Sequence, residues 1–192
     1  YDRLTTALRV REKRLELTIV HADVNDLLKH STSNDRVGQA QVYADLIQRL
    51  KSAGADCAAI TSLGGHFCFD ETVKRSALPL VSALDPLDDF FASRGIKSVG
   101  LLGTSFVMKT RLYGVLSETN AVVPEDIDGV GKAYFDMAMA NACTDAQREK
   151  FFDEGRILVD EKGADAVVLA GTDLNLAFDG REVGYPVFDA LD

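Results

Sequence analysis

Residues 162–173 read KGADAVVLAGTD, and this stretch decides the fold class of the chain. An apolar strand, predicted near 165–170, stands between a Gly-Ala-Asp connector and a turn of small and polar residues. An uninterrupted apolar run of this length is typical of a strand that is buried on both faces of a parallel sheet. Such a sheet needs helices on both faces, so the stretch predicts an α/β protein.

The remainder of the chain alternates in the same way. We expect strands near 16–22, 57–61, 79–82, 97–102, 165–170 and 186–189, and a weaker strand near 120–123. Amphipathic stretches predict helices near 1–13, 36–53, 65–75, 84–94, 104–117, 125–142, 144–162 and 172–178. Gln147 follows Thr144 by three positions, which is the pattern of a capping box at the start of a long helix.

Two segments of this pattern occur twice in the same order. A Gly-Ala-Asp connector, an apolar strand and a small polar turn follow one another from Gly54, and again from Gly163, 109 residues later. The sequence LPLVSALD at 78–85 has its counterpart in YPVFDALD at 185–192, 107 residues later. Two matches at nearly the same spacing indicate an internal repeat. The alternative is that both segments are common connectors of αβ units.

The repeat predicts two similar α/β lobes, residues 1–94 and 95–192, each with a parallel sheet flanked by helices. We expect a pseudo-two-fold axis to relate the lobes and a cleft to lie between them. Ligands of such folds bind beyond the carboxyl ends of the strands. Because Ser62 and Gly171 stand at equivalent strand ends, we expect them on opposite sides of the cleft, close to a ligand.

Composition limits the class of function. The chain has 192 residues, is 46% hydrophobic and carries a formal net charge of −9. Nucleic acid is therefore an unsuitable partner, because phosphate binding needs a dense Lys and Arg surface. No apolar run approaches the roughly 18 residues of a membrane span. The three cysteines have no metal-like spacing and no signal peptide is recognisable, so we expect reduced thiols in a cytoplasmic protein.

The segments that follow three of the predicted strands are rich in small and polar residues, and residues of these segments are the candidates for a ligand site. They are Ser62, Leu63, Gly64, Gly65 and His66 in the first group, Thr104 and Ser105 in the second, and Gly171, Thr172 and Asp173 in the third. Helix capping is the alternative role of Ser62, Thr104 and Asp173. A tight turn is the alternative for the glycine pair, and a structural role is the alternative for His66.

Over nearly its whole length the sequence resembles the aspartate/glutamate racemase family, part of a superfamily with hydantoin racemases, maleate isomerases and arylmalonate decarboxylases. The resemblance rests on AGAD at 53–56 through His66, LLGT at 101–104 through Tyr113, VLAGTD at 168–173 and YPVFD at 185–189. It implies an isomerase that needs neither a metal ion nor another cofactor and acts on a small carboxylate or amino-acid ligand. Because the family often forms dimers, the resemblance also allows a homodimer.

The resemblance has implications for the ends of the chain. Family members open with a strand and a Gly-Gly turn, which would lie before Tyr1 of this sequence. Their last helix would follow Asp192. We therefore expect the sequence to represent the family fold incompletely.

The sequence departs from the family pattern where the chemistry is expected. The family places a cysteine followed by Asn-Thr in one lobe and a Gly-Cys-Thr-Glu turn in the other, so that two thiols remove and return the proton beside a carboxylate. By this resemblance Ser62 and Gly171 stand in the thiol positions, Leu63-Gly64 replaces Asn-Thr, and Asp173 replaces Glu. Glycine has no acid or base group, and serine is a poor base without a proton acceptor.

We therefore hypothesise a racemase-family isomerase that uses Ser62, His66 and Asp173 as non-standard acid/base residues. The ligand-binding residues of this hypothesis are Leu63, Gly64, Gly65, Thr104, Ser105, Gly171 and Thr172. The alternative is a catalytically inactive carboxylate-binding or sensing protein on the same scaffold.

Overall fold

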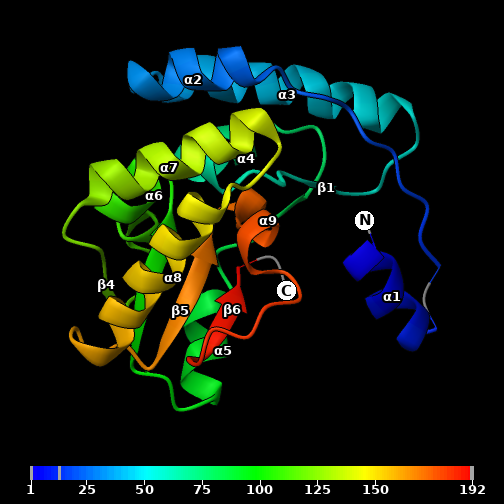
Figure 1. Ribbon diagram of the computed structural model, residues 1–192. Coiled ribbons are helices and arrows are strands. Elements are labelled where there is room, and N and C mark those ends of the chain that lie inside the picture. The colour runs from blue at the N-terminus through cyan, green and yellow to red at the C-terminus, as the bar shows by residue number, and fades with distance from the viewer. Residues whose placement is uncertain (1, 13, 191–192) are drawn as a thin grey trace. The chain divides into compact units, whose positions relative to one another are not determined.

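Figure 1 shows the computed structural model, which describes residues 2–12 and 14–190. The chain forms two compact units. The first unit contains the described residues up to Ile60 together with Gly65–Val81, and the second contains Thr61–Gly64 and the described residues from Ser82 onward. The short segment Thr61–Gly64 therefore belongs to the second unit, although the residues before and after it in the sequence belong to the first unit.

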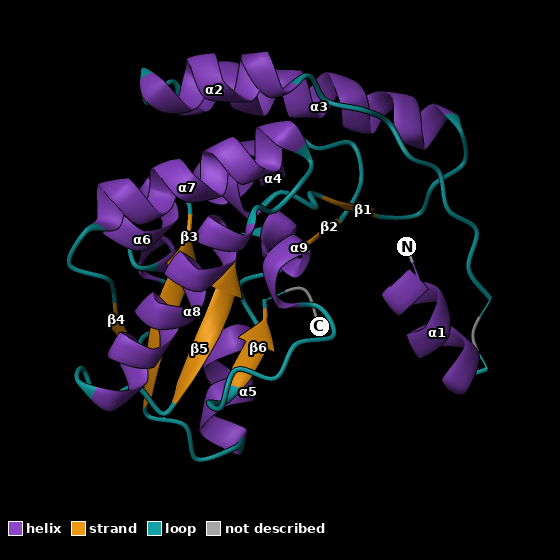
Figure 2. Cartoon of the chain, viewed as in Figure 1, coloured by secondary structure: helices purple, strands orange, loops and turns teal. Residues whose placement is uncertain are grey.

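The second unit is built on a four-stranded parallel sheet, drawn in orange in Figure 2. Its strands are β3 (Ser98–Gly103), β4 (Asn120–Val122), β5 (Ala166–Ala170) and β6 (Val187–Asp189), in the order β4-β3-β5-β6. All of β5 and all of β3 after its first residue are buried. The two central strands are thus the continuous apolar runs of the sequence, as a parallel sheet covered on both faces requires.

The helices of the second unit cover both faces of this sheet. They are α5 (Leu87–Ser93), α6 (Ser105–Lys109), α7 (Ile127–Ala140), α8 (Asp145–Asp160) and α9 (Asn175–Phe178), with short 3-10 segments η2 (Leu112–Gly114) and η3 (Thr172–Leu174). On one face α8 packs closely on β3, because Gly100 has no side chain: a Cβ there would stand 2.8 Å from the Cβ of Leu158. The predicted capping box of Thr144 and Gln147 opens α8.

The other face of the sheet is covered by α5. Gly100 pairs with Val167, so the next residues along the strands, Val168 and its partner Phe188, point to the opposite face. There the ring of Phe188 packs edge-on against Phe90 of α5, with 5.4 Å between the ring centroids. The α/β fold with a parallel sheet flanked by helices is confirmed.

The first unit contains the remaining elements. They are α1 (Asp2–Val10), α2 (Val24–Thr32), α3 (Arg36–Ser52), β1 (Ala58–Ala59), α4 (Phe69–Val73) and β2 (Leu80–Val81). The 3-10 segment η1 (Leu63–Cys68), whose first two residues belong to the second unit, leads into α4. The strands β1 and β2 pair in parallel. The first unit thus has a short version of the strand pairing in the second unit.

The internal repeat is visible in this pairing. Ala58 of β1 pairs with Leu80 of β2, and Val167 of β5 pairs with Val187 of β6. Shifts of 109 and 107 residues, read from the sequence, convert the first pair into the second. In each unit the amide of the first member also donates a hydrogen bond of 2.9 Å to the carbonyl of the proline before its partner. The repeated segments therefore adopt the same local structure, whereas the expected cleft stays a prediction.

One expected strand does not form. Residues 16–22 have no regular secondary structure and belong to no ladder of the described sheets. Leu17 and Ile19, which the pattern would bury, are 46% and 77% exposed. A strand is held by hydrogen bonds to a neighbouring strand, so the predicted strand at 16–22 is wrong for want of a partner among the described residues.

The structure also contains a helix outside the predicted set. A helix that the sequence pattern did not predict, α2, is capped by Asp23, whose carboxylate accepts from the amide of Asn25 at 2.8 Å. In the structure α5 groups with the second unit, through Phe90 and Phe91 against Phe188. The division into domains at 94 and 95 stays a prediction.

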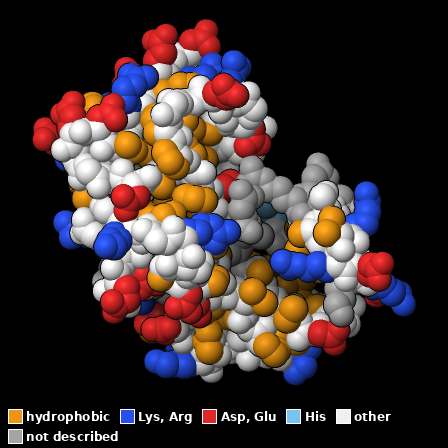
Figure 3. All heavy atoms as spheres, turned by 90° about the horizontal axis from the view of Figure 1, so that it is seen from below, with side chains coloured by type: hydrophobic (Ala, Val, Ile, Leu, Met, Phe, Trp, Pro, Cys, Tyr) orange, Lys and Arg blue, Asp and Glu red, His pale blue; other side chains and the backbone are white. Residues whose placement is uncertain are grey.

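Charged side chains of both signs lie over the face shown in Figure 3, where Lys and Arg stand singly or in small groups among Asp and Glu. The structure contains surface ion pairs, for example Lys132 with Asp136 and Arg156 with Asp153. In the part of the chain that the structure describes, no helix is both long enough and apolar enough to cross a membrane.

Asp88 of α5 fixes the segment that leads into β4. Its carboxylate accepts from the amides of Ser117, Glu118 and Thr119 at 2.7, 2.9 and 3.0 Å. The amide of Glu118, followed by the other donors, lowers the pKa of Asp88 well below its ordinary value of 3.8. Because the folded pKa is depressed, the contribution of Asp88 to stability is complete well above pH 3.8 and is lost as the pH falls through the folded pKa.

We predict that Asp88→Asn lowers the free energy of unfolding by about 1 kcal/mol at pH 7, since solvent screens part of the interaction. Urea unfolding of both proteins at pH 7 and at pH 3 measures this. The difference in free energy of unfolding between the two proteins should be smaller at pH 3, where the Asp88 carboxylate has begun to lose its stabilising contribution. An unchanged or larger difference at pH 3 would contradict the assignment.

Candidate functional site

The candidate site is built on the neighbouring carboxyl ends of β3 and β5. These parallel strands pair along their length, and the last pair joins Gly103 to Ala170. Thr104 and Gly171 are the next residues of each strand, so the pairing places them side by side at one edge of the sheet. Gly103 must be small, because a Cβ there would collide with the carbonyl oxygen of Ala170.

Thr104 and Ser105 begin α6. The Thr104 hydroxyl accepts from the amide of Val107 at 3.2 Å and so caps the helix. The Ser105 hydroxyl faces α7, where a Cβ on Gly131 would collide with it. In the structure both side chains thus have packing or capping contacts, and their expected role in ligand binding stays a prediction.

The turn after β5 carries the carboxylate of the site. Asp173, in η3, accepts a hydrogen bond of 2.8 Å from the hydroxyl of Tyr134 and one of 3.3 Å from the hydroxyl of Thr172. Both bonds end on Oδ2 of Asp173. Tyr134 comes from α7 and is 6% exposed, whereas Thr172 and Asp173 are half-buried. The turn therefore holds a partly accessible carboxylate on a buried support.

Tyr134 also explains the glycine at 171. A Cβ on Gly171 would stand 2.5 Å from Cε2, 2.7 Å from Cζ and 2.9 Å from the hydroxyl oxygen of Tyr134. These distances are far inside van der Waals contact, so the tyrosine ring fills the space that any side chain at 171 would need. Burial raises the pKa of Tyr134, with the Asp173 charge adding to the effect, so its hydroxyl stays protonated and remains a donor.

The segment Thr61–Gly64 is joined to the same unit by Tyr113. The hydroxyl of Tyr113 donates to the carbonyls of Leu63 and Gly64, at 2.8 and 3.3 Å. Leu63 is buried, and Ser62 and Gly64 are half-buried. The Ser62 turn therefore has a tyrosine anchor that comes from the chain just after α6.

The backbone around Tyr113 has a rare conformation. Arg111, Leu112, Tyr113 and Gly114 have φ values of +50°, +55°, +60° and +73°. A left-handed conformation costs roughly 1–2 kcal/mol for each residue other than glycine. This left-handed segment ends the helix expected over 104–117 after only α6 has formed. Leu112 is completely buried there, and the Tyr113 hydroxyl is directed toward Leu63. Such strain persists only where surrounding contacts fix it, and it is characteristic of functional regions.

Gly65 and His66 belong to the first unit. A Cβ on Gly65 would collide with the hydroxyl of Tyr43, which lies on α3. Glycine at this position therefore allows α3 to pack closely against the segment. The His66 ring is 4% exposed and stacks on Phe69, with 5.2 Å between centroids and 3° between planes. Burial and stacking agree with the structural alternative for His66, while its expected catalytic role stays a prediction.

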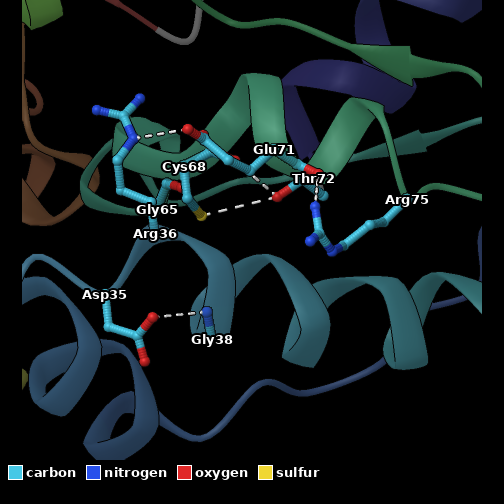
Figure 4. Close-up of polar contacts among 8 residues, drawn as sticks. All are labelled: Asp35, Arg36, Gly38, Gly65, Cys68, Glu71, Thr72 and Arg75. Atoms are coloured by element: carbon cyan, nitrogen blue, oxygen red, sulfur yellow. Dashed lines mark hydrogen bonds and ion pairs between the residues drawn. The ribbon is translucent and has the colours of Figure 1, made fainter.

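The helix that follows His66 is held by polar contacts shown in Figure 4. Arg36 pairs with Glu71 at 3.0 Å, and the Cys68 thiol lies 3.6 Å from the carbonyl of Gly65 and 3.7 Å from the hydroxyl of Thr72. Burial raises the pKa of the Cys68 thiol, so the reactive thiolate is disfavoured there. Cys68 is therefore a buried thiol inside the first unit.

The other two cysteines have different surroundings. Burial likewise raises the pKa of Cys143. Cys57 lies in the strand predicted near 57–61, which places it in the core. In the structure β1 begins after Cys57 and the residue is exposed, so that expectation is wrong. Within the described residues, no three His, Cys, Asp or Glu side chains are grouped as metal ligands.

The structure brings together some candidates and adds two residues. Thr104, Gly171, Thr172 and Asp173 gather at the ends of β3 and β5. Helical spacing with Met108 and Leu112 predicts Tyr113 as a core residue, and Tyr134 has the same signal of an apolar stripe, so the sequence pattern identifies neither hydroxyl. Their hydroxyls reach residues 50 and 39 positions away, which no local pattern encodes.

Comparison with known proteins supports this architecture. A family model described as Asp/Glu/Hydantoin racemase matches residues 1–192. Two solved structures cover 100% of this chain and 86% of their own: a candidate Asp/Glu racemase from Yersinia pestis, with 20% identity and a TM-score of 0.82, and an aspartate racemase homologue from Pyrococcus horikoshii, with 23% and 0.77. The Picrophilus torridus aspartate racemase has 22% identity and a TM-score of 0.72, covering 90% of this chain and 73% of its own. At these identities the three structures demonstrate a shared fold.

We predict that Tyr113→Phe lowers the free energy of unfolding by about 1 kcal/mol, because the carbonyls of Leu63 and Gly64 lose a donor. Amide hydrogen exchange should accelerate in residues 61–64. Tyr185→Phe is the matched control, since its hydroxyl donates to the carbonyl of Phe152 at 3.1 Å. If exchange in 61–64 responds equally to both substitutions, Tyr113 is not the specific anchor of this turn.

Proposed function

The chain belongs to the Asp/Glu/Hydantoin racemase family, and from that premise we propose that it is a cofactor-independent isomerase of a small carboxylic acid. The proposed reaction removes the proton from the carbon next to a carboxylate and returns one to the opposite face. An amino acid is the first substrate class to examine and a hydroxy acid the second.

The observation that carries this proposal is the carboxylate at the end of β5. Asp173 is held at Oδ2 by two hydroxyls on a half-buried turn next to the end of β3. Its carboxylate can accept the α-proton of a bound acid and become a carboxylic acid. The electron pair then spreads into the carboxylate of the substrate, where backbone N–H groups of the turns at Thr104 and Gly171 can stabilise it.

The second proton transfer needs another group. Ser62 is the candidate from the turn that Tyr113 anchors, and His66 is the candidate from within η1, three residues before α4 begins. Serine needs a partner to take its proton, and a histidine can both donate and accept near neutral pH. We assign the return of the proton to these two residues.

The rival function is carboxylate binding without turnover. The glycine at 171 favours it, because a position without a side chain supplies no acid or base group. The two functions differ in one measurable event, the exchange of the α-proton with solvent.

We predict that the protein exchanges the α-proton of at least one acid in a panel of L- and D-amino acids and 2-hydroxy acids in deuterated water. Proton NMR detects the loss of the α-proton signal, and chiral chromatography detects the inverted product. Saturable binding with no exchange for any acid would establish the rival function instead.

We predict that Asp173→Asn lowers the exchange rate by about 10²–10⁴, because it removes an acid/base group. Ser62→Ala and His66→Gln should lower it to a similar or smaller extent, and the more affected variant identifies the second group. Glu182→Gln, at an exposed position, is the control and should leave the rate unchanged. If Asp173→Asn exchanges at the wild-type rate, the proposed site is wrong even when the reaction is found.

A further inference from the structure

Tyr134, which supports Asp173, makes two separate contacts with its side chain. The ring of Tyr134 occupies the position that a side chain at 171 would take, with Cε2 only 2.5 Å from an ideal Cβ there. The hydroxyl of the same residue donates to Oδ2 of Asp173 at 2.8 Å. A substitution at either 134 or 171 should therefore affect the other position and the carboxylate together.

Tyr134 is itself held from several sides. It lies on the buried side of α7, where Val130 and Met137, one turn before and one turn after it, are fully buried. Its own exposure is 6%, which leaves little surface for contact with a ligand. Tyr134 is thus suited to act through Asp173, and Asp173 is the residue with access to solvent.

The hydrogen bonds also distinguish the two oxygens of Asp173. Tyr134 and Thr172 both donate to Oδ2, and neither bond uses Oδ1. A hydrogen bond from a hydroxyl to a carboxylate is among the stronger ones, and it restricts the orientation of the carboxyl plane. A phenol that stays protonated supplies this restraint throughout the neutral pH range.

We propose that Tyr134 is the positioning residue of the site: it holds Oδ2 of Asp173 so that Oδ1 is the oxygen presented to the ligand, and it requires glycine at 171. This inference rests on the proposed function for its kinetic consequence, while its structural part stands independently. A misplaced catalytic group can cost about 100-fold in rate without loss of the fold, which is the signature to look for.

The first experiment is kinetic and uses the acid of the panel that exchanges fastest. Tyr134→Phe, which keeps the ring and removes the hydroxyl, should lower kcat for α-proton exchange by about 10- to 100-fold and leave KM within about two-fold. Tyr185→Phe should change neither. A Tyr134→Phe enzyme with wild-type kcat, or one that changes only KM, would overturn the positioning role.

The second experiment needs no activity, so it separates failure of this inference from failure of the proposed function. Crystal structures of the wild type and of Tyr134→Phe report the orientation of the Asp173 carboxylate. We expect one orientation with Oδ2 on Tyr134 in the wild type, and a rotated or divided carboxylate in the variant. The same single orientation in both proteins would refute the proposal, even if the wild type exchanges no acid.

The requirement for glycine is tested by a double-mutant cycle. Gly171→Ala should lower the melting temperature by about 5 °C, because the added Cβ meets the Tyr134 ring. In a Tyr134→Leu background, where the ring is absent, the same substitution should cost less than half of that shift. Equal shifts in both backgrounds would show that Tyr134 does not decide the residue at 171.

Discussion

The parallel pairing of β3 with β5 is the constraint on which the rest of the structure depends. Its register brings Gly103 level with Ala170, so both strands release their chains at the same edge of the sheet. Without that register, the turns at Thr104 and Gly171 would not be neighbours, and the carboxylate of Asp173 would not lie next to the end of β3. The glycine at 103 makes the pairing sterically tolerable, because a side chain there would meet the backbone of β5.

Two tyrosines each hold a segment that carries candidate site residues. Tyr113 reaches Leu63 and Gly64 from a left-handed turn, and the backbone cost of that turn is offset by the burial of Leu112 and by the hydrogen bonds of the Tyr113 hydroxyl. Tyr134 holds Asp173 from below, at the expense of any side chain at 171. In both cases a tyrosine from a packed helix or turn fixes the position of a segment that follows a strand.

Much of the fold could be predicted from the sequence, because its strongest signals are local. The apolar runs at β3 and β5 and the capping box of α8 each lie within a short window, and the internal repeat is a match between pairs of such windows. The segment 16–22 has an equally good pattern and forms no strand, since pairing depends on a neighbour rather than on the pattern itself. The sequence likewise predicted the Gly171–Asp173 turn, but its support by Tyr134 depends on a contact across 39 residues.

The central claim is that a small acid binds at the edge where β3 and β5 end. The most direct measurement is a titration of the isotopically labelled protein with each acid of the panel, followed by two-dimensional amide NMR spectra. The account predicts saturable shifts that are largest for the amides of Thr104, Gly171 and Thr172. Saturable shifts centred on other elements, or no shifts with any acid, would contradict it.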